Sequence, residues 1–300
     1  MAGAANHARE YSVAVQHPLL SRLSGAFQLI QPFPTCLLQA LPATLFMWVA
    51  SPSGDPRLWL LLFLSVTAVY GAVGSLNDYC DYELDKLSKP GKPLVRGLVT
   101  PRFALWQALI LTGLSLLLSL ALNWLTACFS ALILALGAWY DVRAKRSFLS
   151  WVPYAIGIPT LPLWGFAAAG RLHPRLLLAY PLGALLSVAL NMSNTLPDRE
   201  ADAAFGLRAL THRLTLWQAV LLVWGLFAVS ILGFAASAPL VGNDWRILGP
   251  GLALGALLLI LMIANYAIFR SKRSLAGNWW ISGLLSLIVG LSWVASLRLQ

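Results

Sequence analysis

Long apolar runs separated by short polar segments dominate the chain. A helix needs about 20 mainly apolar residues to cross a bilayer, and several runs reach or approach that length. They cover residues 24–50, 58–77, 103–122, 124–140, 149–169, 176–193, 215–241, 248–268 and 277–297. The pattern therefore predicts about nine transmembrane helices.

The kind of membrane fold follows from the same pattern. The runs lack the ten-residue alternation of an outer-membrane barrel, and a helix is then the remaining way to satisfy backbone hydrogen bonds in lipid. Hydrophobic residues make up 59% of the chain and charged residues 11%, whereas soluble domains carry roughly 25% charged residues. We expect an all-α polytopic membrane protein, a single domain over residues 1–300 with a polar cytoplasmic segment at 1–22.

The basic residues are sorted by loop. The net charge is +10, but sixteen Lys and Arg residues lie at the N-terminus and near the even-numbered loops, against five on the other side. This distribution favours membrane topology and argues against a nucleic-acid partner. By the positive-inside rule the N-terminus is cytoplasmic. We expect an integral protein of a bacterial or archaeal cell membrane.

Two polar segments stand out at the ends of the second and sixth runs. NDYCDYELD (77–85) and NTLPDREAD (194–202) share the form N-x-x-x-D-x-E-x-D and hold seven of the eleven acidic residues. On a helix, positions i, i+4 and i+8 lie along one face. They are occupied by Asn77, Asp81 and Asp85 in the first motif and by Asn194, Asp198 and Asp202 in the second. If only one motif were present, solvated acids in a loop would be the simpler interpretation. The recurrence of Asn, Asp, Glu and Asp at the same spacing argues against that interpretation.

Carboxylates one turn apart, at about 6 Å, repel each other by about 3 kcal/mol at an effective dielectric of 20. A cation relieves that repulsion, and hard oxygen ligands suit Mg²⁺ better than zinc. Mg²⁺ commonly takes further ligands from a substrate phosphate. The two motifs, both expected in the cytoplasm, therefore indicate a magnesium cofactor and a phosphate ester.

Basic residues follow the first motif and the fourth run, where a polyanion needs them. The segment LDKLSKPGKPLVRG has Pro and Gly residues that predict a loop able to fold over a site, and YDVRAKRS lies on the same membrane face. The candidates for diphosphate contact are Lys92, Tyr140, Arg143 and Lys145. Topology and lipid headgroups explain basic residues equally well, and we prefer that role for Arg270, Lys272 and Arg273.

These residues carry a family resemblance. NDYCDYELD is similar to the N-D-x-x-D-x-x-x-D motif of the UbiA superfamily of intramembrane prenyltransferases, and NTLPDREAD resembles its D-x-x-x-D motif. The resemblance implies a horseshoe of nine helices around a central cavity that holds a prenyl diphosphate beside a small hydrophobic acceptor, open to membrane lipid. It implies Mg²⁺ ligation by Asn77, Asp81, Asp85, Asn194, Asp198 and Asp202, and catalytic roles for Asp78, Asp81, Asp85, Asp198 and Asp202.

The chain also departs from the family pattern. Gln31 stands where many relatives have Arg, which removes one candidate substrate contact, and Pro197 interrupts a helix through the second motif. Three prolines in run 149–169 predict a bent helix.

The motifs and the resemblance leave three candidate activities for the protein. Prenyl transfer to an aromatic quinone-type precursor is preferred; cyclisation of a prenyl diphosphate is the alternative, and a cation transporter is a third possibility that the clustering of acids on one face disfavours.

Overall fold

The computed structural model describes residues 18–204, 206 and 208–297. Most of the expected polar segment 1–22 therefore lies outside the described residues. In chain order the longer helices are α2 (Pro18–Leu29), α3 (Leu37–Ala50), α4 (Pro56–Cys80), α6 (Pro101–Leu122), α7 (Trp124–Val142), α9 (Thr160–Ala168), α10 (Tyr180–Thr195), α12 (Leu216–Val241), α13 (Trp245–Phe269) and α14 (Lys272–Ala295). The short elements are η2 (Pro32–Cys36), α5 (Tyr82–Ser88), η3 (Ala144–Arg146), η4 (Phe148–Trp151), α8 (Val152–Gly157), η5 (Pro174–Ala179), α11 (Arg199–Ala204) and η6 (Leu210–Arg213).

The prediction of an all-helical membrane protein is confirmed, but nine unbroken spans are not. Within the described chain, seven helical segments are long and apolar enough to cross a membrane. They are Pro56–Cys80, Pro101–Leu122, Trp124–Val142, Pro174–Thr195, Leu216–Val241, Trp245–Phe269 and Lys272–Ala295. The two remaining predicted spans, 24–50 and 149–169, are each divided into shorter helices.

Proline explains both divisions. The first run breaks between α2 and α3, where Gln31 has a φ of 52° and Phe33, flanked by two prolines, has an extended backbone. The other run breaks between α8 and α9, just before Thr160. At this break the carbonyl of Ile156 accepts hydrogen bonds from the Thr160 hydroxyl at 2.6 Å and the Tyr180 phenol at 2.8 Å. Side chains thus satisfy a carbonyl near the break, as membrane burial requires.

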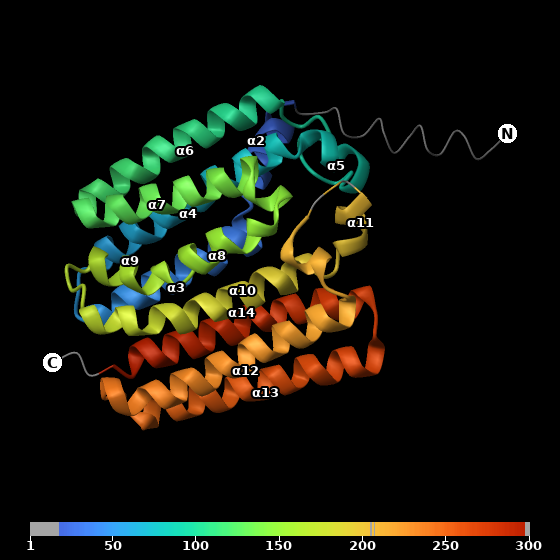
Figure 1. The fold of residues 1–300 in the computed structure, drawn as a ribbon. Coiled ribbons are helices and arrows are strands. Elements are labelled where there is room, and N and C mark those ends of the chain that lie inside the picture. The colour runs from blue at the N-terminus through green and yellow to red at the C-terminus, as the bar shows by residue number, and fades with distance from the viewer. Residues whose placement is uncertain (1–17, 205, 207, 298–300) are drawn as a thin grey trace.

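The long helices run side by side in a bundle (Figure 1). α3 packs on α4, α9 and α14; α10 packs on α8, α12 and α14; and α13 packs on α14. α3 therefore brings the N-terminal part of the chain into contact with α14, the last helix. The core at these contacts includes Trp164, Phe166 and Trp293, all essentially inaccessible.

Both acidic motifs lie at one end of the bundle. The short helices α5 and α11, which follow the two motifs, lie near each other at the end where α2 begins and where α13 turns into α14 (Figure 1). At the starts of α4 and α13, Asp55 and Asp244 cap the helices by accepting from the amides of Arg57 and Arg246, each at 2.9 Å. These two acids therefore have a capping role.

Candidate active site

The first motif spans the junction between α4 and α5. Asp81 sits between the two helices with φ −95° and ψ 3°. The spacing of one turn nevertheless persists, because the Asp81 amide donates to the Asn77 carbonyl at 2.9 Å and the Asp85 amide donates to the Asp81 carbonyl at 2.8 Å. The predicted stripe of Asn77, Asp81 and Asp85 is therefore present along this segment.

The carboxylates of this motif are buried and paired with cations. Asp78 and Asp85 are 2% and 1% exposed, and the ammonium of Lys92 lies between them, at 2.5 Å from Asp78 and 3.0 Å from Asp85. Burial opposes the charge on Lys92, but the two carboxylates outweigh it and raise the pKa of the ammonium above its ordinary value. Lys92 is therefore a positive charge held at the centre of the motif.

The loop that carries Lys92 is folded onto the site, as its sequence predicts. Its turn is closed by bonds from the Arg96 amide to the Lys92 carbonyl at 3.0 Å and from the Leu98 amide to the Pro93 carbonyl at 3.0 Å. Leu94 and Val99 are buried against the end of α2. These apolar contacts hold the charged side chain in place.

A second lysine reaches the motif from the other direction. Lys145, in η3 just after α7, is almost buried, and its ammonium lies 2.7 Å from Asp81 and 3.6 Å from Asp141. Asp141 also accepts a hydrogen bond of 2.8 Å from the side-chain amide of Asn77. Sequence reasoning did not select Asp141, although it directly follows Tyr140 in the YDVRAKRS segment that it did select.

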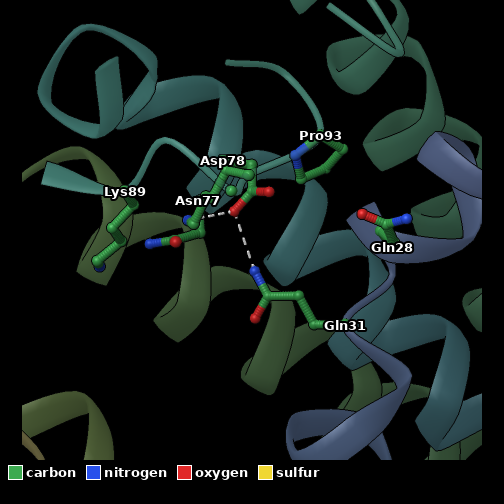
Figure 2. A pocket seen from close by; sticks show the side chains of 8 residues that line it. Gln28, Gln31, Asn77, Asp78, Lys89 and Pro93 are labelled. Atoms are coloured by element: carbon green, nitrogen blue, oxygen red, sulfur yellow. Dashed lines mark hydrogen bonds and ion pairs between the residues drawn. The ribbon is translucent and has the colours of Figure 1, made fainter. Parts of the chain in front are cut away.

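A cavity of about 400 Å³ opens beside the motif. Figure 2 shows Gln31 pointing at Asp78, to which its amide donates a 3.0 Å hydrogen bond. The residues that line the cavity are Gln28, Gln31, Asn77, Asp78, Lys89, Gly91, Lys92 and Pro93. Gln31 is therefore a neutral donor at the site. The loss of a substrate contact, expected from Gln in place of Arg, stays a prediction.

The second motif has a different geometry. α10 ends at Thr195 and α11 begins at Arg199. The interruption predicted from Pro197 is therefore present, and Asn194, Asp198 and Asp202 do not lie along one continuous helix. The Asp202 amide still donates to the Asp198 carbonyl at 2.8 Å, whereas no equivalent bond joins Asp198 to Asn194 in the described backbone. The physical cause is the break that proline imposes on a helix.

The side chains of the second motif are more open. Asn194 is exposed, and Asp198, 51% exposed, pairs with Lys272 at 3.1 Å. Lys272, for which we predicted a role in topology and headgroup contact, therefore contacts the second motif. Burial and the neighbouring Asp198 carboxylate raise the pKa of Asp202 above its ordinary value, and the charges of Lys89 and Asp81 also act on it. The two motifs thus share one electrostatic environment.

Two other predicted residues lie at the edge of this arrangement. The ring of Tyr140 meets that of Tyr154 edge to face, with centroids 5.5 Å apart. Arg143 is exposed and pairs with no carboxylate among the described residues. Diphosphate contact by these two residues stays a prediction.

The donor chemistry of the first motif fits Mg²⁺. Carboxylate and amide oxygens are the ligands it prefers, and neither oxygen of Asp85 accepts a hydrogen bond from a described residue, although lysine ammonium groups lie 3.0 and 3.9 Å away. In the described part of the chain, however, no three His, Cys, Asp or Glu side chains converge as a metal site. Lysines hold the carboxylates in this arrangement.

The protein belongs to the UbiA prenyltransferase family, whose family model matches residues 39–282. It is an integral membrane enzyme of the prenyltransferase class. The digeranylgeranylglyceryl phosphate synthase of Thermococcus sibiricus is 28% identical over 242 residues, 78% of this chain and 81% of that protein. The 4-hydroxybenzoate octaprenyltransferase of Xanthomonas campestris pv. campestris is 33% identical over 184 residues, 58% of this chain and 59% of that protein.

Solved structures share the fold. A UbiA homologue from Archaeoglobus fulgidus bound to GPP and Mg²⁺ superposes with a TM-score of 0.72 at 18% identity, covering 90% of this chain and 99% of that one. The apo structure of a UbiA homologue from Aeropyrum pernix K1 gives 0.70 at 22% identity, covering 85% of this chain and 95% of that one.

Proposed function

We propose that the protein transfers a prenyl group from a prenyl diphosphate to a small hydrophobic acceptor in a Mg²⁺-dependent reaction, with the diphosphate bound at the first acidic motif. The observation that carries this proposal is the set of buried carboxylates, Asp78, Asp81 and Asp85, matched with lysines beside a polar cavity. The family membership and the solved relative with GPP and Mg²⁺ support it.

Each group of residues has a distinct role in this proposal. Mg²⁺ would be held by Asn77, Asp81 and Asp85 together with Asn194, Asp198 and Asp202, and it would stabilise negative charge on the leaving diphosphate. Lys92 and Lys145 turn from carboxylate to diphosphate and neutralise the remaining charge. The surrounding apolar helices exclude water, so that the acceptor rather than water captures the prenyl group.

The acceptor we propose is an aromatic quinone-type precursor, a choice supported by the similarity to 4-hydroxybenzoate octaprenyltransferase. A glyceryl phosphate acceptor is the second candidate, because several relatives are digeranylgeranylglyceryl phosphate synthases. Membrane lipid surrounds the helices, and the charge distribution supports a cytoplasmic active site.

The test is turnover by the purified protein in nanodiscs, with prenyl diphosphates of different lengths, with and without Mg²⁺. The acceptors are 4-hydroxybenzoate, dihydroxynaphthoate and a geranylgeranylglyceryl phosphate, and products are followed by mass spectrometry. We expect a Mg²⁺-dependent adduct with one acceptor and a loss of roughly 100-fold or more in Asp81→Asn. Glu83→Gln, on the exposed side of α5, is the matched control.

The results separate the alternatives. A cyclised hydrocarbon formed without acceptor supports the cyclase. Unchanged turnover in Asp81→Asn refutes the assigned site, and no consumption of any prenyl diphosphate refutes the proposed function.

A further inference from the structure

A buried carboxylate outside both acidic motifs contacts the first of them. Asp141 lies in the last turn of α7 and is 1% exposed. Its Oδ1 accepts the 2.8 Å hydrogen bond from Nδ2 of Asn77, which is 64 residues earlier in the chain and belongs to α4. The bond therefore joins α7 to the start of the motif.

This bond decides which end of the Asn77 amide faces the site. An asparagine side chain has one acceptor oxygen and one NH₂ donor group. A carboxylate accepts only, so the NH₂ group of Asn77 turns toward Asp141 and the oxygen turns away from it. Rotation of the amide by half a turn places two oxygens against each other, which is unfavourable. Mg²⁺ requires the oxygen, and Asn77 itself lines the cavity.

The same carboxylate oxygen also faces Lys145. The ammonium lies 3.6 Å from Oδ1 of Asp141 and 2.7 Å from Oδ1 of Asp81. The ammonium therefore lies between two carboxylates that both attract it. Asp141 therefore acts on both a proposed metal ligand and a proposed diphosphate contact.

We propose that Asp141 is a positioning residue that presents the amide oxygen of Asn77 to the metal–diphosphate site and holds Lys145 beside Asp81. The inference rests on the proposed function, because it takes Asn77 as a ligand of that site. Removal of such supporting partners commonly lowers metal affinity by about 10- to 100-fold.

The experiment measures binding of Mn²⁺ with inorganic diphosphate by electron paramagnetic resonance, using the full-length protein in nanodiscs. Asp141→Asn keeps the shape but no longer dictates the amide orientation, and we expect about 10-fold weaker binding. Asp141→Leu removes the acceptor, and we expect about 100-fold weaker binding. Glu83→Gln, whose parent side chain is exposed and paired with Lys86, is expected to bind like the wild type.

A swapped pair tests the contact directly. Asn77→Asp places a carboxylate against Asp141 and weakens binding. The double variant Asn77→Asp with Asp141→Asn restores a hydrogen bond of reversed polarity and keeps an oxygen toward the site. We expect it to bind more tightly than Asn77→Asp alone. Thermal unfolding of the same samples separates this effect from a loss of folding.

The outcomes are distinct. Wild-type affinity in both Asp141 variants overturns the inference alone, as does a double variant no better than Asn77→Asp. Failure of the wild-type protein to bind Mn²⁺ with diphosphate overturns the proposed function and this inference with it.

Discussion

Lys92 occupies the space between Asp78 and Asp85, two buried carboxylates of the motif at which we propose that the diphosphate binds. Its ammonium compensates charge that would otherwise be buried and unpaired, and breaking one partner of a buried pair commonly costs about 3–5 kcal/mol. The same position makes Lys92 a competitor of Mg²⁺ while diphosphate is absent. Metal and diphosphate are therefore expected to bind together, since Asp85 would be free to hold the metal once Lys92 pairs with the diphosphate.

Lys92→Met tests this competition. Without diphosphate, we expect the variant to unfold at a lower temperature than the wild type and to regain more stability on addition of Mg²⁺, because the carboxylates are free. With a prenyl diphosphate we expect a KM roughly 10-fold higher or more. The measurements are thermal unfolding with and without Mg²⁺ and steady-state kinetics. Equal Mg²⁺ stabilisation in variant and wild type would refute the competition, and Lys86→Met, in an exposed pair, is the control.

The pH dependence of this pair has a defined sign. The folded-state pKa of Lys92 lies above its ordinary value, so the stability it contributes is fully present below the unfolded pKa of about 10.4 and is lost only as the pH rises through the folded-state pKa. We expect the difference in stability between Lys92→Met and the wild type to be constant from about pH 7 to 9. A difference that disappears in this range would contradict the pairing.

At the residue scale the sequence located the first motif but not its supporting contacts. Asn77, Asp81 and Asp85 were found by their spacing alone, because backbone bonds keep them one turn apart even where the helix breaks. Asp141 was missed because a single acid has no periodic signal and its partner, Asn77, is remote in sequence. Lys272 meets Asp198 only through the tertiary packing of α14, which no local pattern reports.

At the element scale, close approach of helices depends on glycine where no side chain fits. At Gly165 of α9 an added Cβ would lie 2.6 Å from the Ala43 carbonyl oxygen and 2.7 Å from the Phe46 Cβ, both in α3. In membranes, small residues let helices pack closely. The contact of α3 with α9 therefore requires glycine at this position.

Gly165→Ala is expected to destabilise the protein by about 1–3 kcal/mol, because the two helices must separate or shift. Equilibrium unfolding in mixed micelles measures the change in free energy. Gly290→Ala in α14 is the matched control, since no heavy atom beyond the adjacent residues and the local helix backbone lies within 4 Å of the added Cβ. This variant is expected to be neutral or slightly stabilising. Similar unfolding of the two variants would show that α3 and α9 do not need this contact.

The breaks between elements were predictable only in part. The prolines of run 149–169 predicted a bend, and the structure has a break between α8 and α9. Pro197 signalled an interruption of the second motif, but not that Asn194 and Asp198 would be left exposed. How a break is resolved depends on the elements packed around it, and hydrophobic periodicity contains no information about them.

At the scale of the whole molecule, both motifs and the loops that carry Lys92, Lys145 and Lys272 meet at one end of the bundle (Figure 1). That gathering follows from topology, because each of these segments lies at the same end of a membrane-crossing helix. The predicted orientation places this end in the cytoplasm. α4 spans 25 residues, about 38 Å at 1.5 Å per residue, so its two ends lie on opposite sides of a core about 30 Å thick.

Cysteine labelling across α4 tests the orientation. In a background with Cys36, Cys80 and Cys128 replaced by Ala, single cysteines are introduced as Ser53→Cys before α4 and Glu83→Cys after it; both parent residues are exposed. We expect a membrane-impermeant maleimide to label Ser53→Cys in intact cells and Glu83→Cys only in inverted vesicles. The reason is that the excess of positive charge at the motif end resists translocation across the membrane. The reverse labelling pattern would contradict a cytoplasmic active site and would require the prenyl diphosphate to arrive from outside the cell.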